Sequence, residues 1–371
     1  MRIGVPKEIK SQEYRVGLTP ESVSELVADG QEVWVETQAG AGIGAEDKNY
    51  VAAGAVIKTT AKEIFDACDM IVKVKEPQAV ERAMLRPGQI LYTYLHLAPD
   101  PDQTRELIES GAVCIAYETV TDDSGELPLL KPMSQVAGRL ATQVGATALQ
   151  KFGGGRGVLL GGVPGVGSGK VVIIGGGDVG YNAALMAIGM QAEVTILERS
   201  NKVMEKLSYE FGNRAQVRRS TPGGLAKILT EADLVIGAVL IPGAAAPKLV
   251  TREMLSTMKD GAVLVDVAID QGGCFETSRP TTHKEPTYVL DGVVHYCVTN
   301  MPGAVARTST LALNNATLPF VISLASKGYK QAMRDDPHLL NGLNVCAGHI
   351  THQAVATDLG KDYVPALELL K

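Results

Sequence analysis

The sequence has little of what marks several specialised classes of protein. It contains no apolar run long enough to span a membrane, and the opening MRIGVPKEIK has charges too early for a signal peptide. It has no basic stripe, and its net charge of −6 argues against a nucleic-acid partner. The five cysteines are widely spread and form no C-x-x-C. They therefore predict reduced thiols in a cytoplasmic protein.

What remains is the composition of an ordinary globular protein. Hydrophobic residues make up 45% of the chain and charged residues 20%, and glycine is plentiful at 40 of 371 residues. The length predicts about two domains. No internal repeat is evident.

The strongest local signal is a glycine turn between two predicted strands. Gly175, Gly177 and Gly180 stand at G-x-G-x-x-G spacing, and Glu198 ends the second strand about 20 residues later. This order is the dinucleotide-binding fingerprint in its required context. Glycines in a turn are often only turn residues, but both strands and the acid favour a cofactor site. The predicted elements are a strand at 171–174, a helix at 181–190 and a strand at 193–197.

Each residue of the fingerprint has a physical role in that interpretation. Gly175 allows the tight turn, Gly177 lets the backbone approach a pyrophosphate, and Gly180 lets the helix pack close to the strand. The phosphates then lie at the positive end of the helix. Glu198 would bind a ribose diol and repel a 2′-phosphate, so the sequence predicts NAD rather than NADP.

The first 130 residues alternate predicted strands with predicted helices. This alternation predicts a largely parallel sheet with helices on its faces. One helix starts at Thr19-Pro20, a cap followed by proline in the first turn, and stops at Gly30. Strands are predicted at 2–5, 33–36, 70–74, 90–95 and 113–117, and further helices at 61–67, 79–85 and 101–110.

Polar side chains follow the ends of several of these strands. Lys75 follows one strand, His96 the next and Glu118 another, while Arg15 lies in the loop after the first. Because parallel sheets bind ligands at the carboxyl ends of their strands, these residues predict a shared pocket. Taken singly, Lys75 or Arg15 is better explained as a solvated loop residue.

The second half predicts another sheet. The glycine-rich stretch 153–170 is not a phosphate-binding P-loop, because Pro164 takes the first glycine position and Val171 follows Lys170. Asp270 follows a strand and should point into the cofactor crevice, although Asp before Gly-Gly is also common turn chemistry. The predicted elements are helices at 134–151 and 304–318 and strands at 217–219, 234–240, 263–268 and 288–299.

The tail, residues 319–371, is predicted to be helical. His349 and His352 stand three residues apart and could bind a metal on one helix face. No matching acid or cysteine supports a metal there, so none is predicted.

Arg15, Lys75, His96 and Asp270 together suit hydride transfer. Arginine matches a planar carboxylate, lysine stabilises charge on a carbonyl oxygen, and histidine and aspartate move protons. The predicted substrate therefore carries a carboxylate beside a carbonyl or imine, as 2-hydroxy and 2-amino acids do. The residues alone leave that choice open.

Longer stretches carry a resemblance to bacterial alanine dehydrogenases over nearly the whole chain. They are IGVPKEIK, EYRVGLTP, VKVKEP, YLHLAPD, GGGDVG, DVAIDQGGC and NMPGAVARTSTLALNNATLP. The resemblance implies NAD-dependent oxidative deamination of L-alanine to pyruvate and ammonia, and the reverse reaction. It implies a homohexamer of two Rossmann-like α/β domains. The NAD domain, 131–304, is inserted into a substrate domain of residues 1–130 and 305–371.

The same resemblance assigns the site residues. Arg15 and Lys75 would bind the substrate carboxylate and keto oxygen, and His96 and Asp270 would be the acid–base pair. No metal is implied. The NAD site would comprise Ser134, Gly175, Gly177, Asp178, Val179, Gly180, Glu198, Ser220, Val239, Leu240, Val267, Asp270, Arg279, Val298, Asn300 and Met301.

Two departures and two alternatives accompany this assignment. The ribose acid is Glu198 where the family commonly has aspartate, and Asp178 stands where many relatives have an apolar residue. One alternative is a dehydrogenase for another small 2-amino acid. The other is an NAD-binding subunit of the transhydrogenase type, which would not need His96.

Overall fold

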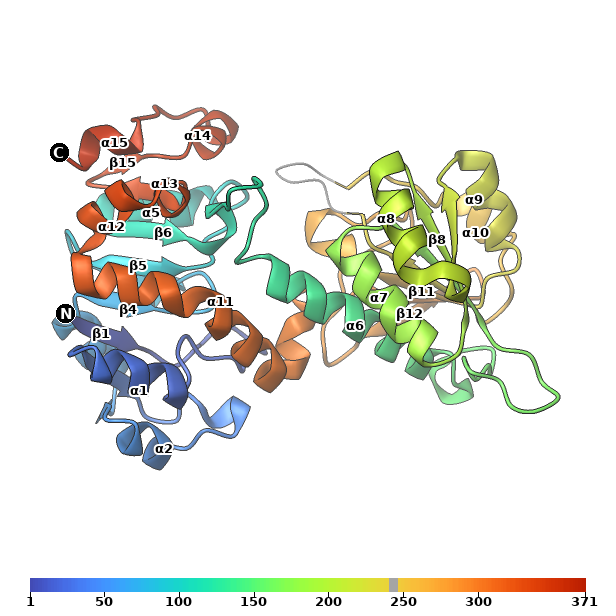
Figure 1. The fold of residues 1–371 in the computed structure, drawn as a ribbon, viewed down its shortest axis with the longest axis horizontal. Helices are drawn as coiled ribbons and strands as arrows, with labels where there is room; N and C mark the ends of the chain where they lie inside the picture. Colours follow the sequence, from blue (N-terminus) through green and yellow to red (C-terminus); the bar gives the residue numbers. More distant parts are fainter. Residues whose placement is uncertain (240–245) are drawn as a thin grey trace. The chain divides into compact units, whose positions relative to one another are not determined.

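The computed structural model describes residues 1–239 and 246–371, which form two compact units. Unit 1 comprises Met1–Met133 and Val305–Lys371, and unit 2 comprises Ser134–Ala304. Each is an α/β unit built on a largely parallel sheet (Figure 1), which confirms the predicted fold class. No helix within the described residues is long and apolar enough to cross a membrane.

The sheet of unit 1 has eight strands in the order β15-β14-β6-β5-β4-β1-β2-β3. β1 to β6 run parallel, and the last two strands of the chain join antiparallel at one edge. The central strands are buried apolar runs, as expected for a sheet covered on both faces. The strands are β1 (Arg2–Val5), β2 (Glu32–Glu36), β3 (Val56–Lys58), β4 (Met70–Val72), β5 (Ile90–Thr93), β6 (Val113–Ala116), β14 (Leu343–Cys346) and β15 (His349–Ile350).

Four helices of unit 1 begin at the predicted residues 20, 61, 79 and 101, whereas the helix at 47–52 was missed and the one predicted from 304 begins at Ala306. Thr19 caps α1 by accepting a hydrogen bond from the Ser22 N–H, and Pro20 opens the helix. Figure 1 shows α1 and α11 on one face of the sheet, and the Asn314 amide of α11 bonds both Thr19 N and Gly17 O. The helices are α1 (Pro20–Ala28), α2 (Asp47–Ala52), α3 (Ala61–Ala67), α4 (Ala79–Arg82), α5 (Pro101–Ser110), α11 (Ala306–Lys327), α12 (Tyr329–Asp335), α13 (Pro337–Leu340), α14 (Gln353–Leu359) and α15 (Ala366–Leu369).

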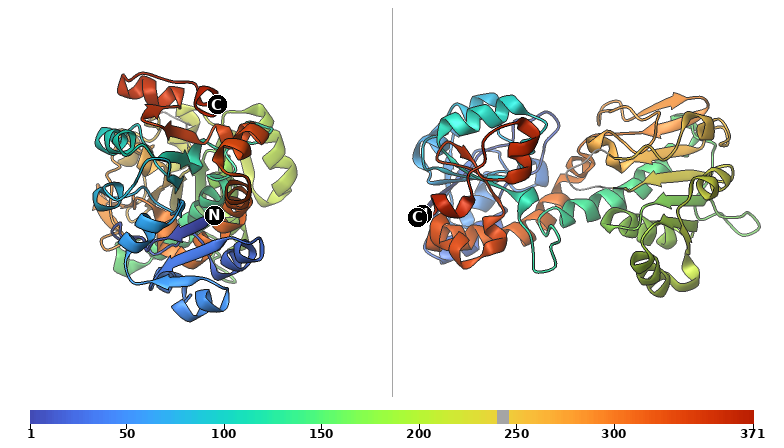
Figure 2. Two further views of the ribbon diagram at one scale, coloured as in Figure 1. Left: turned by 90° about the vertical axis from the view of Figure 1, so that its left-hand side faces the viewer. Right: turned by 90° about the horizontal axis from the view of Figure 1, so that it is seen from above.

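The tail departs from the prediction. It contains β14 and β15, and β14 pairs with β6, so the red segment lies at the edge of the unit 1 sheet (Figures 1 and 2). His349 belongs to β15 and His352 precedes α14, so the two do not share one helix face. The short strand β3 was missed, and α11 continues through Pro319 to Lys327 rather than ending at 318. In each case tertiary packing overrides weak local propensity.

The sheet of unit 2 has seven strands in the order β12-β13-β11-β10-β7-β8-β9. Only β12 is antiparallel among these strands of the described chain. The strands are β7 (Lys170–Ile174), β8 (Glu193–Glu198), β9 (Gln216–Arg219), β10 (Leu234–Gly237), β11 (Val263–Asp266), β12 (Thr287–Leu290) and β13 (Val293–Tyr296). The main helices are α6 (Lys131–Ala148), whose first turn belongs to unit 1, α7 (Asp178–Gly189), α8 (Asn201–Phe211), α9 (Pro222–Leu229) and α10 (Arg252–Leu255).

Several predicted elements of unit 2 need correction. The strand predicted at 263–268 ends at Asp266, where a 3-10 helix, η5 (Val267–Gln271), begins. The single region at 288–299 is a hairpin of β12 and β13.

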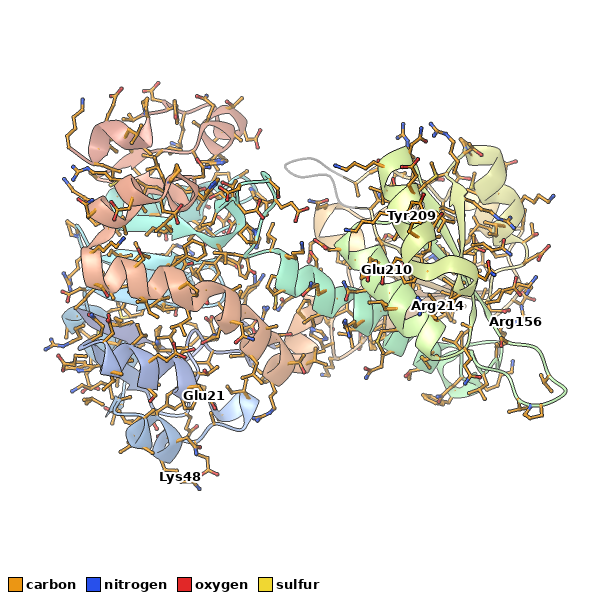
Figure 3. The ribbon with its side chains drawn as sticks, viewed as in Figure 1. Glu21, Lys48, Arg156, Tyr209, Glu210 and Arg214 are labelled. Atoms are coloured by element: carbon orange, nitrogen blue, oxygen red, sulfur yellow. The ribbon has the colours of Figure 1, made fainter. Side chains whose placement is uncertain are left out.

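Exposed side chains such as Tyr209 on α8 and Lys48 on α2 lie on the outer surfaces of their units (Figure 3).

The two sheets share one strand order. In each, the chain starts at a central strand (β1 or β7), adds two strands on one side, and then crosses to the other side. The strand order therefore reverses between β1 and β4 in unit 1 and between β7 and β10 in unit 2. Ligands of open α/β sheets bind at such switch points, beyond the carboxyl ends of the strands.

Candidate active site

The switch point of unit 1 brings the loops after β1 and β4 together. A Cβ on Gly17 would lie 2.3 Å from the Val72 carbonyl oxygen, so the first loop can press onto the end of β4 only with glycine there. Arg15 lies in that loop, Lys75 follows β4 and His96 follows β5. The structure thus places all three at the carboxyl edge of one sheet.

Arg15 is buried and held by a carboxylate that sequence reasoning missed. Its Nε and Nη2 donate to the two oxygens of Glu13 at 2.7 and 2.6 Å, and only 2% of the residue is exposed. Burial opposes the charge, but the hydrogen bonds and charge of Glu13 outweigh it and raise the pKa of Arg15. Nη1 points to the Met133 sulfur at 3.1 Å. The guanidinium is therefore a fixed cation with one edge taken by Glu13.

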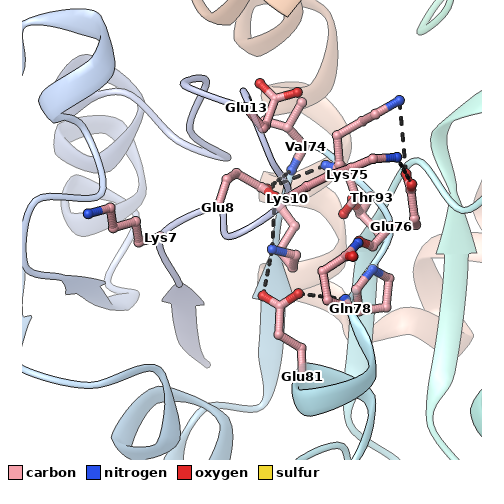
Figure 4. A network of polar contacts seen from close by, with 12 residues as sticks. Lys7, Glu8, Lys10, Glu13, Val74, Lys75, Glu76, Gln78, Glu81 and Thr93 are labelled. Carbon is pink, nitrogen blue, oxygen red and sulfur yellow. Dashed lines mark hydrogen bonds and ion pairs between the residues drawn. The ribbon is translucent and has the colours of Figure 1, made fainter. Parts of the chain in front are cut away.

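A second buried network lies under Lys75. Lys73 Nζ, fully buried, lies 3.0 Å from Glu8 Oε2 and 2.8 Å from Glu81 Oε1. Figure 4 labels these two acids beside Lys75. Burial raises the pKa of Glu8, against the opposing effect of Lys73. Glu8 Oε1 also accepts the N–H of Val74 at 2.7 Å and that of Lys75 at 3.4 Å. The network thus fixes the backbone that carries Lys75, and the two lysines at alternate positions of VKVK were the signal in the sequence that pointed to it.

Lys75 and His96 are more accessible than Arg15. The Lys75 side chain is 14% exposed, with its Nζ 3.9 Å from Glu76 Oε2. The His96 side chain is 44% exposed, and its ring lies parallel to that of Tyr94 at 5.8 Å between centroids. Glu118 accepts the His96 N–H at 2.5 Å. A rigid arginine therefore lies at the same sheet edge as two groups that a ligand can reach.

The switch point of unit 2 is built from glycines. Gly175 has φ +103°, and a Cβ there would lie 2.7 Å from the Ala238 carbonyl oxygen in the loop after β10. A Cβ on Gly180 would lie 1.8 Å from the Gly175 oxygen, whereas one on Gly177 would meet no atom within 4 Å. The predicted roles of close packing for Gly180 and open approach for Gly177 therefore fit the geometry.

The helix and acid of the fingerprint differ in detail from expectation. Helix α7 begins at Asp178 rather than at residue 181, so this exposed acid lies in its first turn, where the helix dipole favours it. Glu198 Oε2 accepts the Gly176 N–H at 2.7 Å, and Oε1 accepts the N–H groups of Arg199 and Ser200 at 2.6 and 2.8 Å. Glu198 thus ties the end of β8 to the glycine turn.

The other residues assigned to NAD lie mostly past the ends of parallel strands. Val179 is buried in α7, and Ser134 lies on α6. Leu240 lies outside the described residues. The positions past strand ends are Ser220 after β9, Val239 after β10, Val267 and Asp270 in η5, and Val298, Asn300 and Met301 after β13.

The loop that carries Asp270 is fixed by Asp266. This buried acid accepts the N–H groups of Ala268 and Cys274 at 3.1 and 2.9 Å and the Ser278 hydroxyl at 2.5 Å, and burial raises its pKa. Asp270 itself is exposed on η5.

Arg279, also assigned to NAD, follows the same loop. Its guanidinium carbon lies 4.2 Å from the centre of the Tyr288 ring, and its backbone N–H donates to the Tyr288 hydroxyl at 3.0 Å. No cluster of three His, Cys, Asp or Glu able to hold a metal occurs among the residues that the structure describes.

Family models match almost the whole chain. Residues 4–137 match the N-terminal domain of alanine dehydrogenase/PNT, and residues 141–353 match the C-terminal domain. The chain belongs to the alanine dehydrogenase/PNT family. This membership confirms the resemblance seen in the sequence and implies a nicotinamide cofactor for the Rossmann-type domain.

Individual members of the family are similar over their full lengths. The alanine dehydrogenase of Halomonas elongata is 58% identical over 370 residues, covering 100% of both chains. A solved L-alanine dehydrogenase superposes with a TM-score of 0.95 at 51% identity, covering 97% of this chain and 99% of that one. A transhydrogenase from Sinorhizobium meliloti is more distant, with a TM-score of 0.83 at 25% identity, covering 95% and 100%.

Proposed function

We propose that this chain is an NAD-dependent alanine dehydrogenase, which converts L-alanine to pyruvate and ammonia and catalyses the reverse reaction. The observation that carries the proposal is full-length similarity to proteins with that name, at 58% identity in one case. Unit 1 provides the substrate site and unit 2 the NAD site.

The geometry of unit 2 suits a dinucleotide. The space above Gly177 is open at the N-terminus of α7, where unpaired N–H groups favour a pyrophosphate. Glu198 at the end of β8 provides an anion that disfavours a 2′-phosphate, so NAD is preferred to NADP. A nicotinamide bound to this unit would supply the acceptor for the hydride that leaves the alanine Cα.

The residues of unit 1 hold the substrate. Arg15 binds the carboxylate, and Glu13 holds the guanidinium in place through Nε and Nη2. Lys75 stabilises the oxygen as it gains negative charge in the carbinolamine that leads to pyruvate. His96 and Asp270 share the proton transfers: one activates the water that attacks the iminium carbon, and protonation of the nitrogen releases ammonia.

The first test is NADH formation from NAD⁺ and L-alanine, measured beside glycine, L-serine and L-lactate. We expect turnover with L-alanine and none with L-lactate. Preference for glycine or L-serine would make the chain a dehydrogenase for another small 2-amino acid. NAD binding without turnover on any of them would favour the transhydrogenase-type subunit, since the chain is also similar in fold to the Sinorhizobium transhydrogenase.

The proposal extends to assembly and location. We propose a homohexamer of 39.2 kDa chains, which light scattering would detect as a sixfold mass. We also propose a cytoplasmic enzyme, consistent with five buried cysteines in the thiol form.

A further inference from the structure

His96 lies on a backbone that few residues adopt. Its φ is +50°, in the left-handed region, although it is not glycine. A conformation of this kind is strained for a residue with a side chain and persists only where the surroundings determine it. Something around His96 must therefore hold the turn.

Glu118 holds the N–H side of that turn. Its Oε1 accepts the N–H of His96 at 2.5 Å and that of Leu95 at 3.1 Å, and Oε2 also accepts Leu95 N–H, at 3.2 Å. Strands β5 and β6 are parallel neighbours with Thr93 beside Ala116, so Glu118 and His96 both lie just past the ends of adjacent strands. One carboxylate thus satisfies two successive backbone donors.

Helix α5 holds the carbonyl side. The Gln103 amide donates to Leu95 O at 2.6 Å, and the Thr104 hydroxyl donates to Leu97 O at 3.0 Å. Leu95 and Leu97 are themselves buried. The turn is therefore held from both sides, and removing the N–H acceptor should release it locally without unfolding the core.

We propose that Glu118 is a positioning residue for His96, an inference that rests on the proposed function. Its carboxylate fixes the left-handed turn and so places the imidazole where it can move a proton. The gap from Glu118 Oε1 to His96 Nδ1 is 3.9 Å, which is too long for a hydrogen bond, so Glu118 acts through the backbone.

The test compares Glu118→Ala with Glu118→Gln, whose amide oxygen can still accept both N–H groups. We expect Glu118→Ala to lower kcat for L-alanine about 10–100-fold, since small misplacements of a catalytic group cost that much. Its KM for NAD should stay within about twofold, as for surface changes. Glu118→Gln should recover most of kcat.

Asp122→Ala is the matched control. Asp122 also accepts two backbone N–H groups, those of Ser124 and Glu126 at 2.9 Å each, in the loop after Glu118. Its loss should leave kcat within about twofold. If thermal unfolding shows that Glu118→Ala is not folded, Gln103→Leu replaces it as the test variant, because it releases the carbonyl side of the same turn. Gln103→Leu should lower kcat with the KM for NAD unchanged.

The outcomes separate this inference from the function beneath it. A wild-type protein with no turnover on L-alanine would overturn the function. An active wild type with normal kcat in Glu118→Ala, or with glutamine no better than alanine, would overturn only the positioning role. If glutamine is no better than alanine, the charge of Glu118 matters for kcat rather than its hydrogen bonds to the turn.

Discussion

The two units share a strand order but equip their switch points in opposite ways. In both units, a glycine after the first strand lets its loop pack against the end of the strand on the other side of the switch point. Gly17 packs against the Val72 carbonyl oxygen in unit 1, and Gly175 packs against the Ala238 carbonyl oxygen in unit 2. Beyond that contact, unit 1 has buried charged side chains, Arg15 with Glu13 and Lys73 with Glu8, whereas unit 2 has exposed backbone at a helix N-terminus.

Under the proposed function, this difference would let one topology serve two kinds of ligand. A small carboxylate substrate needs a few charges fixed in place, and buried acids such as Glu13 fix them. A pyrophosphate needs several N–H donors and room for close approach, which glycine provides. Unit 1 should therefore be sensitive to loss of charge, and unit 2 to added side-chain volume.

The sharpest test of this division is the loss of the proton-transfer groups. We expect His96→Ala and Asp270→Asn each to lower kcat by about 10²–10⁴, the usual contribution of general acid–base catalysis. NAD affinity, measured by NADH fluorescence titration, should be unchanged in His96→Ala. Near-normal turnover in both variants would remove the acid–base assignment.

Loss of a buried charge should destabilise unit 1 strongly. Glu13→Ala removes the bidentate partner of a guanidinium that stays buried, so we expect about 3–5 kcal/mol less stability in urea unfolding. Lys48→Ala is the control, and Figure 3 labels Lys48 at the surface of unit 1. Its ion pair with Glu46 has side chains 74% and 68% exposed and should contribute under about 1 kcal/mol. Equal effects from the two variants would contradict the comparison.

Substitution by alanine should have different effects at two glycines of unit 2. Gly180→Ala places a Cβ 1.8 Å from the Gly175 oxygen, so we expect about 1–3 kcal/mol of destabilisation and weaker NAD binding. Gly177→Ala meets no atom within 4 Å, so it should keep the wild-type Tm and still weaken NAD binding. Wild-type NAD affinity in Gly177→Ala would show that the pyrophosphate lies elsewhere.

The smallest effect concerns pH. Burial lowers the pKa of His295, whose Nε2 lies 2.8 Å from the Thr277 hydroxyl and whose Nδ1 lies 3.0 Å from Val293 O. The folded state therefore resists protonation. The stability contributed by neutral His295 is fully present above the pKa of the unfolded state, about 6.5. As the pH drops below that value, the stability decreases by up to about 1.4 kcal/mol per pH unit. His295→Gln should flatten the loss of stability between pH 7 and pH 5, and the exposed His349→Gln should not.

Local sequence predicted the elements that local forces build. Thr19-Pro20 gave the start of α1, alternating strands and helices gave two parallel sheets, and the glycine spacing gave the turn after β7. Glycine, proline and capping residues act on their immediate neighbours, so their effect can be predicted from the sequence alone.

Contacts between distant segments were decided only by the tertiary structure. The pairing of β14 with β6 brings together residues more than 200 positions apart, and Glu118 reaches His96 across two neighbouring strands. Glu13 is only two residues from Arg15, yet its importance depends on both being buried. Burial and strand neighbourhood are properties of the folded sheet, so no spacing in the sequence could reveal which acids fix the groups of the site.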